Sequence, residues 1–233
     1  MRSLRSVGSA LSRKDAAPAR HLVARLALLC ALGLCAPNAA LSAQPLQIVV
    51  LGDSLSAGFG LSVAEAYPAR LEAALKAKGY DVRIVNAGVS GDTSSAGLAR
   101  LDWAVPAGTD AVILELGGND ALRGLPLAVT RQALDGIVRR LKKQGVEVLI
   151  AGMRAPPNLG AEYTSAFDAI YPALAKAHDV ALVSFFLDGV AADPRLNQPD
   201  GIHPNADGVA IIVQRTLPAV EALIVRAKTR KAP

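Results

Sequence analysis

Cysteine and aromatic side chains are scarce in this 233-residue chain. The two cysteines, Cys30 and Cys35, both fall in an N-terminal segment, and aromatic residues make up 4% of the sequence. From residue 44 onward there is no cysteine to form a disulfide or to act as a nucleophile, so we expect an apolar core to hold the fold. So low an aromatic content also argues against a cleft that stacks sugar rings.

Several well-known α/β motifs are missing as well. No G-x-x-x-x-G-K-[ST] segment occurs, which leaves a phosphate-binding P-loop unsupported. Gly58-Phe59-Gly60 lacks the third glycine of a dinucleotide-binding fingerprint. There is no G-x-S-x-G either, so the usual nucleophile elbow of α/β-hydrolases is absent.

The N-terminal segment has the organisation of a secretory signal. Residues 2–25 carry six basic side chains and one acid, and an apolar stretch, Leu26–Ala36, leads into small residues through Ala43. That stretch is shorter than the roughly 20 residues of a membrane span. We therefore expect residues 1–43 to be a signal peptide, cleaved near residues 42–44, and the mature protein to be periplasmic or secreted. A lipoprotein anchor at Cys30 or Cys35 is the less favoured alternative, because neither follows a suitable small residue.

The expected signal peptide also accounts for the basic charge of the chain. With residues 1–43 removed, nineteen basic and nineteen acidic side chains remain. A formally neutral chain has no excess of cations to neutralise phosphates, which argues against nucleic-acid binding. We expect residues 44–233 to form one domain without a stable membrane span.

Five apolar runs of strand length recur in this domain. They are Gln47–Leu51, Val82–Asn86, Ala111–Leu116, Val146–Ala151 and Val180–Phe185. They are continuous rather than alternating, which is typical of parallel strands covered on both faces. Helical patterns separate the runs, and a last helix is predicted from about residue 205 to 227, with Pro218 kinking it or breaking it in two.

This regular alternation of strands and helices predicts an α/β fold. We expect a three-layer α/β/α architecture around a five-stranded parallel sheet, joined by right-handed crossovers. Five strands suit the flavodoxin-like order 2-1-3-4-5. In such a sheet the chemistry lies outside the carboxyl ends of the strands.

Ser54 stands just past the first predicted strand, in Leu51-Gly52-Asp53-Ser54-Leu55-Ser56. This position suits a catalytic serine. Serine is also a preferred helix N-cap, and the segment alone slightly favours that structural role. The rest of the chain has to decide between the two interpretations.

A serine nucleophile needs a general base, and only two histidines follow the signal segment. His178 ends a predicted helix, where a favourable interaction with the helix C-terminus explains it without catalysis. His203 lies in a turn-rich loop, three residues after Asp200. That spacing lets the carboxylate hold the imidazole Nδ1 and leaves Nε2 facing a serine. A helix-capping aspartate beside an incidental histidine explains the pair about equally well.

Two loops that leave strand ends offer donors for an oxyanion. Gly88 follows the second predicted strand, where its backbone N–H can approach a substrate, and Asn119 follows the third with a side-chain amide. Taken separately, each loop is better explained as an ordinary turn or helix cap. The prediction of a site therefore depends on all of these segments together.

Together, Ser54, Gly88, Asn119 and His203 resemble the SGNH (GDSL-type) hydrolase family, whose four named residues and Asp-x-x-His pair all match. The resemblance spans about residues 46–225. It is closest to the bacterial periplasmic group of acyl-CoA thioesterase I, lysophospholipase and arylesterase. The matching blocks are Gly52–Gly58, Gly91–Ser94, Glu115–Asp120 and Asp200–Pro204.

The resemblance implies a serine hydrolase that cleaves carboxylic esters and thioesters through an acyl-enzyme on Ser54. It assigns Ser54, Asp200 and His203 as catalytic residues and Ser54, Gly88 and Asn119 as the oxyanion hole. Asp53 and Asp120 are expected to secure their loops. No metal or cofactor is implied, and the expected partner is a small acyl ester or thioester, with a lysophospholipid as one candidate.

The resemblance also suggests where the acyl group lies. Ala121–Pro126 resembles the family's mobile loop beside the acyl groove. Met153–Asn158 and Phe185–Leu187 are candidates for the same groove, although structural packing explains both somewhat better. Two other functions stay open: a carbohydrate acetylesterase, and a non-catalytic lipid-binding module with a misaligned triad.

Overall fold

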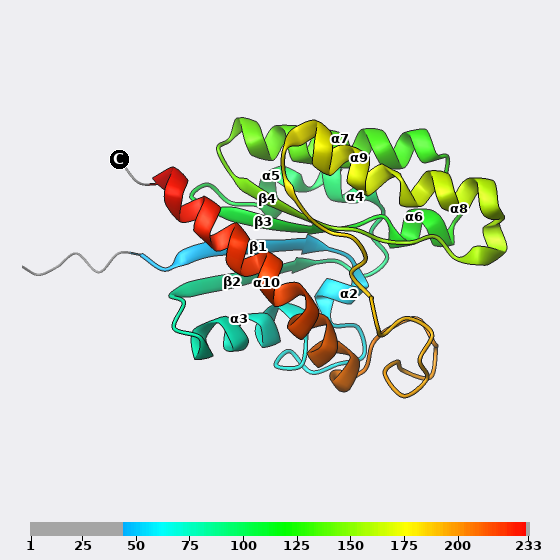
Figure 1. The fold of residues 1–233 in the computed structure, drawn as a ribbon, viewed down its shortest axis with the longest axis horizontal. Coiled ribbons are helices and arrows are strands. Elements are labelled where there is room, and N and C mark those ends of the chain that lie inside the picture. Colours follow the sequence, from blue (N-terminus) through cyan, green and yellow to red (C-terminus); the bar gives the residue numbers. More distant parts are fainter. Residues whose placement is uncertain (1–43, 232–233) are drawn as a thin grey trace, which may run out of the picture. The chain divides into compact units, whose positions relative to one another are not determined.

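A five-stranded parallel sheet forms the centre of the computed structural model, which describes residues 44–231 (Figure 1). The expected signal peptide, residues 1–43, lies outside the described residues. The strand order is β2-β1-β3-β4-β5, so the predicted flavodoxin-like order is confirmed. The strands are β1 (Leu46–Gly52), β2 (Val82–Gly88), β3 (Ala111–Glu115), β4 (Glu147–Ala151) and β5 (Ala181–Val183). The last is shorter than the predicted run, Val180–Phe185.

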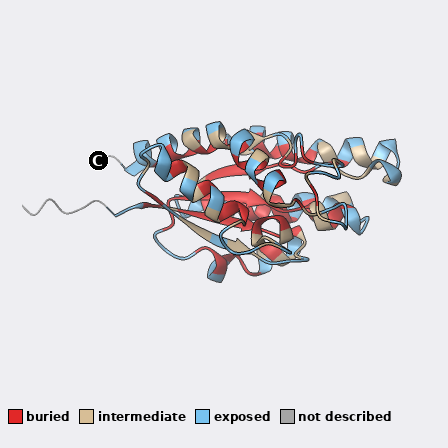
Figure 2. Ribbon diagram, turned by 90° about the horizontal axis from the view of Figure 1, so that it is seen from below, coloured by how far each residue is buried: buried red, intermediate tan, exposed pale blue. Residues whose placement is uncertain are grey.

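Helices cover both faces of the sheet and complete the predicted three layers. α3 and α10 pack on one face, and α4, α7 and α9 lie on the other (Figure 1). The three central strands, β1, β3 and β4, are almost entirely buried between them, whereas the edge strands β2 and β5 are only partly buried (Figure 2). The helical elements are α2 (Ser54–Ala57), α3 (Tyr67–Ala77), α4 (Ser94–Ala99), α5 (Leu101–Ala104), α6 (Gly118–Leu122), α7 (Leu127–Lys143), η1 (Pro157–Leu159), α8 (Ala161–Asp168), α9 (Ile170–His178) and α10 (Ala206–Lys231).

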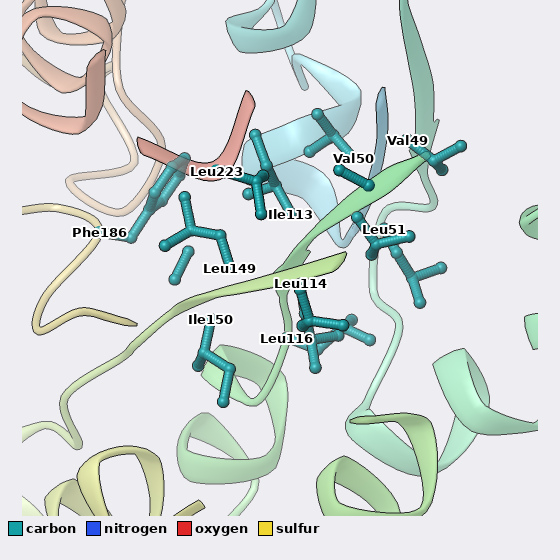
Figure 3. Packing of buried hydrophobic residues seen from close by; sticks show 14 of the residues in the cluster. Val49, Val50, Leu51, Ile113, Leu114, Leu116, Leu149, Ile150, Phe186 and Leu223 are labelled. Carbon is teal, nitrogen blue, oxygen red and sulfur yellow. The ribbon is translucent and has the colours of Figure 1, made fainter. Parts of the chain in front are cut away.

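The continuous apolar runs are explained by burial on both faces, since successive side chains of a strand point to opposite sides. Val50 of β1, Ile113 of β3 and Leu149 of β4 stand in register and face Leu223 of α10 (Figure 3). The next residue of each strand, Leu51, Leu114 and Ile150, points to the opposite face. Alternation of polar and apolar residues would leave one of these faces polar.

α10 continues through Pro218 as one helix, so the predicted break in two does not occur. Among the described residues it is the one helix long and apolar enough to cross a membrane. Nine of its residues are buried, however, and it packs on α3 and the sheet. Its apolar composition is therefore accounted for by its place in the core.

The register of the central strands decides which loops meet. Gly52, the last residue of β1, pairs with Gly88 of β2 on one side and with Glu115 of β3 on the other. Three adjacent strands therefore end in one row. The segments that follow them, which carry Ser54 and Asn119, leave the sheet at a common edge next to Gly88.

Replacing Leu223 with alanine tests the packing of α10 on the sheet. Leu223 is fully buried, so we expect Leu223→Ala to lower the free energy of unfolding by about 2–5 kcal/mol. Val225 lies on the same helix but is 58% exposed, so Val225→Ala should change it by no more than about 0.5 kcal/mol. Urea unfolding measures the free energy of unfolding of both variants. Equal losses would show that α10 is not held by the face that carries Leu223.

Candidate active site

Ser54 is the first residue of α2, directly after the turn that ends β1. The N-cap of this helix is Asp53, whose Oδ1 accepts the backbone N–H of Leu55 at 3.0 Å. A capping role for Ser54 is therefore wrong, because the preceding residue takes it. Ser54 is left half-buried, with its hydroxyl free to contact other parts of the chain.

The Ser54 hydroxyl meets the imidazole of His203, which lies 149 residues further along the chain. Ser54 Oγ is 2.9 Å from His203 Nε2, and His203 Nδ1 is 2.7 Å from Asp200 Oδ2. These distances are normal hydrogen-bond lengths. A carboxylate that accepts from Nδ1–H fixes the tautomer in which Nε2 can take a proton from the serine.

Asp200 is held by its own loop. Its Oδ1 accepts the backbone N–H groups of Ile202 at 2.9 Å and His203 at 3.0 Å. Together with the bond from the His203 ring, these N–H groups lower the pKa of Asp200 from 3.8 to about 2. The carboxylate is consequently ionised at any pH near neutrality.

A second contact fixes the other side of the imidazole. The Phe59 ring lies 4.5 Å from the His203 ring, between centroids. Gln198 Nε2 donates to Phe59 O at 2.7 Å and to Pro204 O at 3.0 Å, which ties the segment after α2 to the His203 loop. The sequence offers no motif that would have identified the role of either residue.

Asn119 lies in α6, and its side chain reaches toward the Ser54 turn. Its Nδ2 donates to Asp53 Oδ2 at 3.1 Å and to Asp92 O at 3.0 Å. Asp53 is buried, which raises its pKa from 3.8 to about 6 against the lowering effect of the bonds from Leu55 and Asn119. Asp53 thus connects the α2 turn to the amide expected to face an oxyanion.

Gly88 packs directly against the Ser54 turn. A Cβ at this position would lie 2.3 Å from Ala57 N and 2.8 Å from Asp53 O, so no other residue fits without displacing the turn. The N–H of Gly88 donates to Asn86 Oδ1 at 2.9 Å. The structure therefore puts Gly88 beside Ser54 but engages its N–H with a neighbouring side chain.

His178 and Asp120, the other residues considered from the sequence, have contacts that explain them without catalysis. His178 ends α9, and its Nε2 is 2.7 Å from Asp135 Oδ1. Asp120 accepts bonds from the Ser94 N–H at 2.8 Å, the Ser94 hydroxyl at 2.5 Å and the Thr130 hydroxyl at 3.0 Å. Asp120 thus connects α6 to α4 and α7, in line with the loop-securing role expected of it.

A cleft of about 420 Å³ opens beside Ser54, Asn119 and His203. Its walls are mainly apolar and come from all three segments that were candidates for the acyl groove. Its lining includes Leu122, Met153, Arg154, Phe185, Leu187 and Ile202. Within residues 44–231, no group of three or more histidine or acidic side chains is arranged to hold a metal ion.

A serine, an imidazole and a carboxylate in hydrogen-bonded series, at the carboxyl edge of a parallel sheet, are the arrangement of a serine hydrolase with an α/β/α fold. Comparison with known proteins agrees with this class. A model of the GDSL-like lipase/acylhydrolase family matches residues 50–211. The chain belongs to this family and is an enzyme that acts on ester bonds.

Three curated relatives show how near the resemblance is. Esterase TesA of Pseudomonas aeruginosa is 40% identical over 178 residues, covering 76% of this chain and 89% of TesA. Thioesterase 1/protease 1/lysophospholipase L1 of Escherichia coli is 42% identical over 178 residues, covering 76% and 84%. An arylesterase of Vibrio mimicus is 41% identical over 162 residues, covering 69% and 81%.

Solved structures show the same fold. The crystal structure of TesA matches with a TM-score of 0.73 at 40% identity, covering 76% of this chain and 99% of TesA. AlinE4, an esterase of the SGNH-hydrolase family, matches with a TM-score of 0.65 at 51% identity, covering 76% of this chain and 95% of AlinE4.

The depressed pKa of Asp200 predicts a pH-dependent contribution to stability. A carboxylate whose pKa is lower in the folded state stabilises the fold above its unfolded value of 3.8, and this stabilisation is lost as the pH falls through about 2. We expect the difference in unfolding free energy between the wild type and Asp200→Asn to shrink as the pH is lowered from about 5 to about 2. Urea unfolding at a series of pH values measures this difference. A difference that stays constant over this range would contradict a lowered pKa of Asp200.

Proposed function

We propose that the protein hydrolyses carboxylic esters and thioesters through an acyl-enzyme on Ser54. The observation that carries this proposal is the hydrogen-bonded series Ser54–His203–Asp200, with contacts of 2.9 and 2.7 Å at the mouth of an apolar cleft. The series provides a nucleophile, a general base and a group that orients the base.

In the proposed reaction, Ser54 Oγ attacks the acyl carbonyl carbon while His203 Nε2 takes the hydroxyl proton. His203 then gives that proton to the leaving alcohol or thiol, and a water molecule repeats the sequence to release the acid. Asp200 stays ionised throughout, because its pKa is about 2, and so stabilises the imidazolium formed in each half-reaction.

The negative charge of the tetrahedral intermediate is held by three donors: the Ser54 N–H, the Asn119 amide and the Gly88 N–H. Asn119 is held by its contact with Asp53 Oδ2, and it contributes by exchanging its second acceptor, Asp92 O, for the oxyanion. Gly88 contributes by exchanging its present acceptor, Asn86 Oδ1, for the oxyanion.

The apolar cleft favours substrates with a hydrocarbon acyl group. The names of the relatives, which include esterase, thioesterase, lysophospholipase and arylesterase, suggest a broad range of leaving groups. A lysophospholipid is one substrate of this kind. A carbohydrate acetylesterase is the second candidate; it would prefer acetylated sugars to medium-length acyl esters and thioesters, so a kinetic profile over both sets separates the two.

Replacing Ser54 with alanine tests the nucleophile. We expect Ser54→Ala to lower kcat/KM for p-nitrophenyl acyl esters by at least about 1000-fold with an unchanged unfolding profile. A fluorophosphonate probe should label the wild type and not this variant. Ser90→Ala, a change at an exposed serine, is the control and should keep both activity and labelling. Turnover retained by Ser54→Ala would refute the mechanism, and a wild type that neither turns over nor reacts with the probe would favour the non-catalytic lipid-binding module.

We further propose that residues 1–43 are removed on export and that residues 44–233 form the mature enzyme. The support is the basic segment, the short apolar stretch and the small-residue exit in the sequence. Expression of the full chain in a Gram-negative host should yield periplasmic protein whose N-terminal sequence begins near residues 43–45. Protein found in the cytoplasm with residues 1–43 still attached would contradict the proposal.

A further inference from the structure

Glu115 places a carboxyl group in the core directly beneath the nucleophile turn. It is the last residue of β3, follows four buried apolar residues and has no solvent exposure. Its Oε2 accepts the hydroxyl of Ser56 at 2.7 Å and the backbone N–H of Asp53 at 3.3 Å. These two donors lie on either side of Ser54, so Glu115 contacts the turn that carries the nucleophile at both ends.

Within residues 44–231, no lysine, arginine or histidine forms an ion pair with Glu115, and Oε1 has no hydrogen-bond partner. The buried Arg100 donates through Nε to Asp92 Oδ2 at 2.5 Å and through Nη2 to Gly52 O at 2.9 Å, and its Nη1 has no partner either. A fully buried carboxylate without a partner costs several kcal/mol, far more than a buried neutral acid.

A second carboxyl group beside Glu115 makes an ionised form still less favourable, and no titratable group around it supplies a positive charge within the described residues. Asp53 is a second buried carboxyl beside it, and the phenols of Tyr67 and Tyr171 are buried and neutral. Asp53 receives bonds from Leu55 and Asn119 on its two oxygens, whereas Glu115 has one unpartnered oxygen. Ionisation of one of two neighbouring buried carboxyl groups disfavours ionisation of the other, and Glu115, which is wholly buried with one unpartnered oxygen, is the one that stays protonated.

We propose that Glu115 is a positioning residue that works as a neutral carboxylic acid, holding the Ser54 turn through Ser56 and the Asp53 N–H. Asp53 is then the one charged member of the pair, and its carboxylate holds Asn119 at 3.1 Å. This role rests on the proposed function, because it matters for catalysis only if Ser54 and Asn119 act as nucleophile and oxyanion donor.

The electrostatics of the pair agree with this geometry. Burial, followed by the negative charge of Asp53, raises the pKa of Glu115 well above its usual value, and the bonds from Ser56 and Asp53 oppose this only in part. A neutral acid keeps the acceptor geometry without adding a second negative charge beneath the oxyanion.

Two substitutions separate shape from charge at this position. Glu115→Leu removes the acceptor, and we expect kcat to fall about 10- to 100-fold with little change in KM, because the turn loses its support. Glu115→Gln keeps an oxygen that can accept from Ser56 and Asp53, and should restore kcat/KM to within about threefold of the wild type. Its pH profile should superimpose on that of the wild type.

The pH profile is the readout that a merely structural role would not predict. If Glu115 were ionised in the wild type, glutamine would remove a negative charge beside Asp53. The acid limb of kcat/KM would then move to lower pH by about one unit or more. Such a shift would overturn the proposal, and so would an inactive but folded Glu115→Gln.

Infrared spectroscopy tests the protonation state without using activity. The difference spectrum of wild type minus Glu115→Gln at neutral pH should contain the C=O stretch of a protonated carboxylic acid, and a carboxylate band in its place would refute the proposal. This measurement stays decisive if Ser54→Ala retains activity, in which case the proposed mechanism fails and the assignment of Glu115 as a neutral acid does not.

Discussion

The site depends on the register of three parallel strands. Because Gly52 pairs with both Gly88 and Glu115, β1, β2 and β3 end at the same level, and each delivers one part of the site to the same edge of the sheet. A shift of one residue in either pairing would turn every side chain of the shifted strand to the other face and remove Gly88 or Glu115 from the Ser54 turn. The buried packing on both faces makes such a shift costly, so the apolar core that stabilises the fold also aligns the site.

Around that row the polar contacts form a connected series. Glu115 holds the Ser54 turn from below, Asp53 caps α2 and binds Asn119, and the His203 loop closes over the serine from the far end of the chain. Gln198 and Phe59 connect that last loop to the segment after α2. Asn119 and Ser54, the proposed oxyanion donor and nucleophile, are thus held by one connected set of contacts, which is the kind of preorganisation that acyl transfer requires.

Much of this could be predicted from the sequence because it depends on patterns that are local. Continuous apolar runs identified five buried strands, and their alternation with helices gave the three layers. Elimination of His178 left His203 as the predicted base for Ser54, although 149 residues separate them.

The sequence did not reveal which of several competing hydrogen-bond partners a group takes, because that depends on distances in the fold. Asp53 rather than Ser54 caps α2, and Asn86 accepts the Gly88 N–H. The role of Glu115 was not predicted either. An acid at the end of an otherwise apolar strand was the one signal for Glu115. Pro218, in turn, was expected to kink or break the last helix, but packing against the sheet holds α10 together as one helix.

The proposed mechanism depends on one oxyanion site between the Ser54 turn and Asn119. A crystal structure of the enzyme after reaction with an alkyl phosphonate tests it most directly, because the phosphonyl oxygen occupies the position of the oxyanion. We expect phosphorus bonded to Ser54 Oγ and an oxygen within about 3 Å of the Ser54 N–H, the Gly88 N–H and Asn119 Nδ2. An adduct whose oxygen points into solvent, with Asn119 and Gly88 still bound to Asp92 and Asn86, would contradict it.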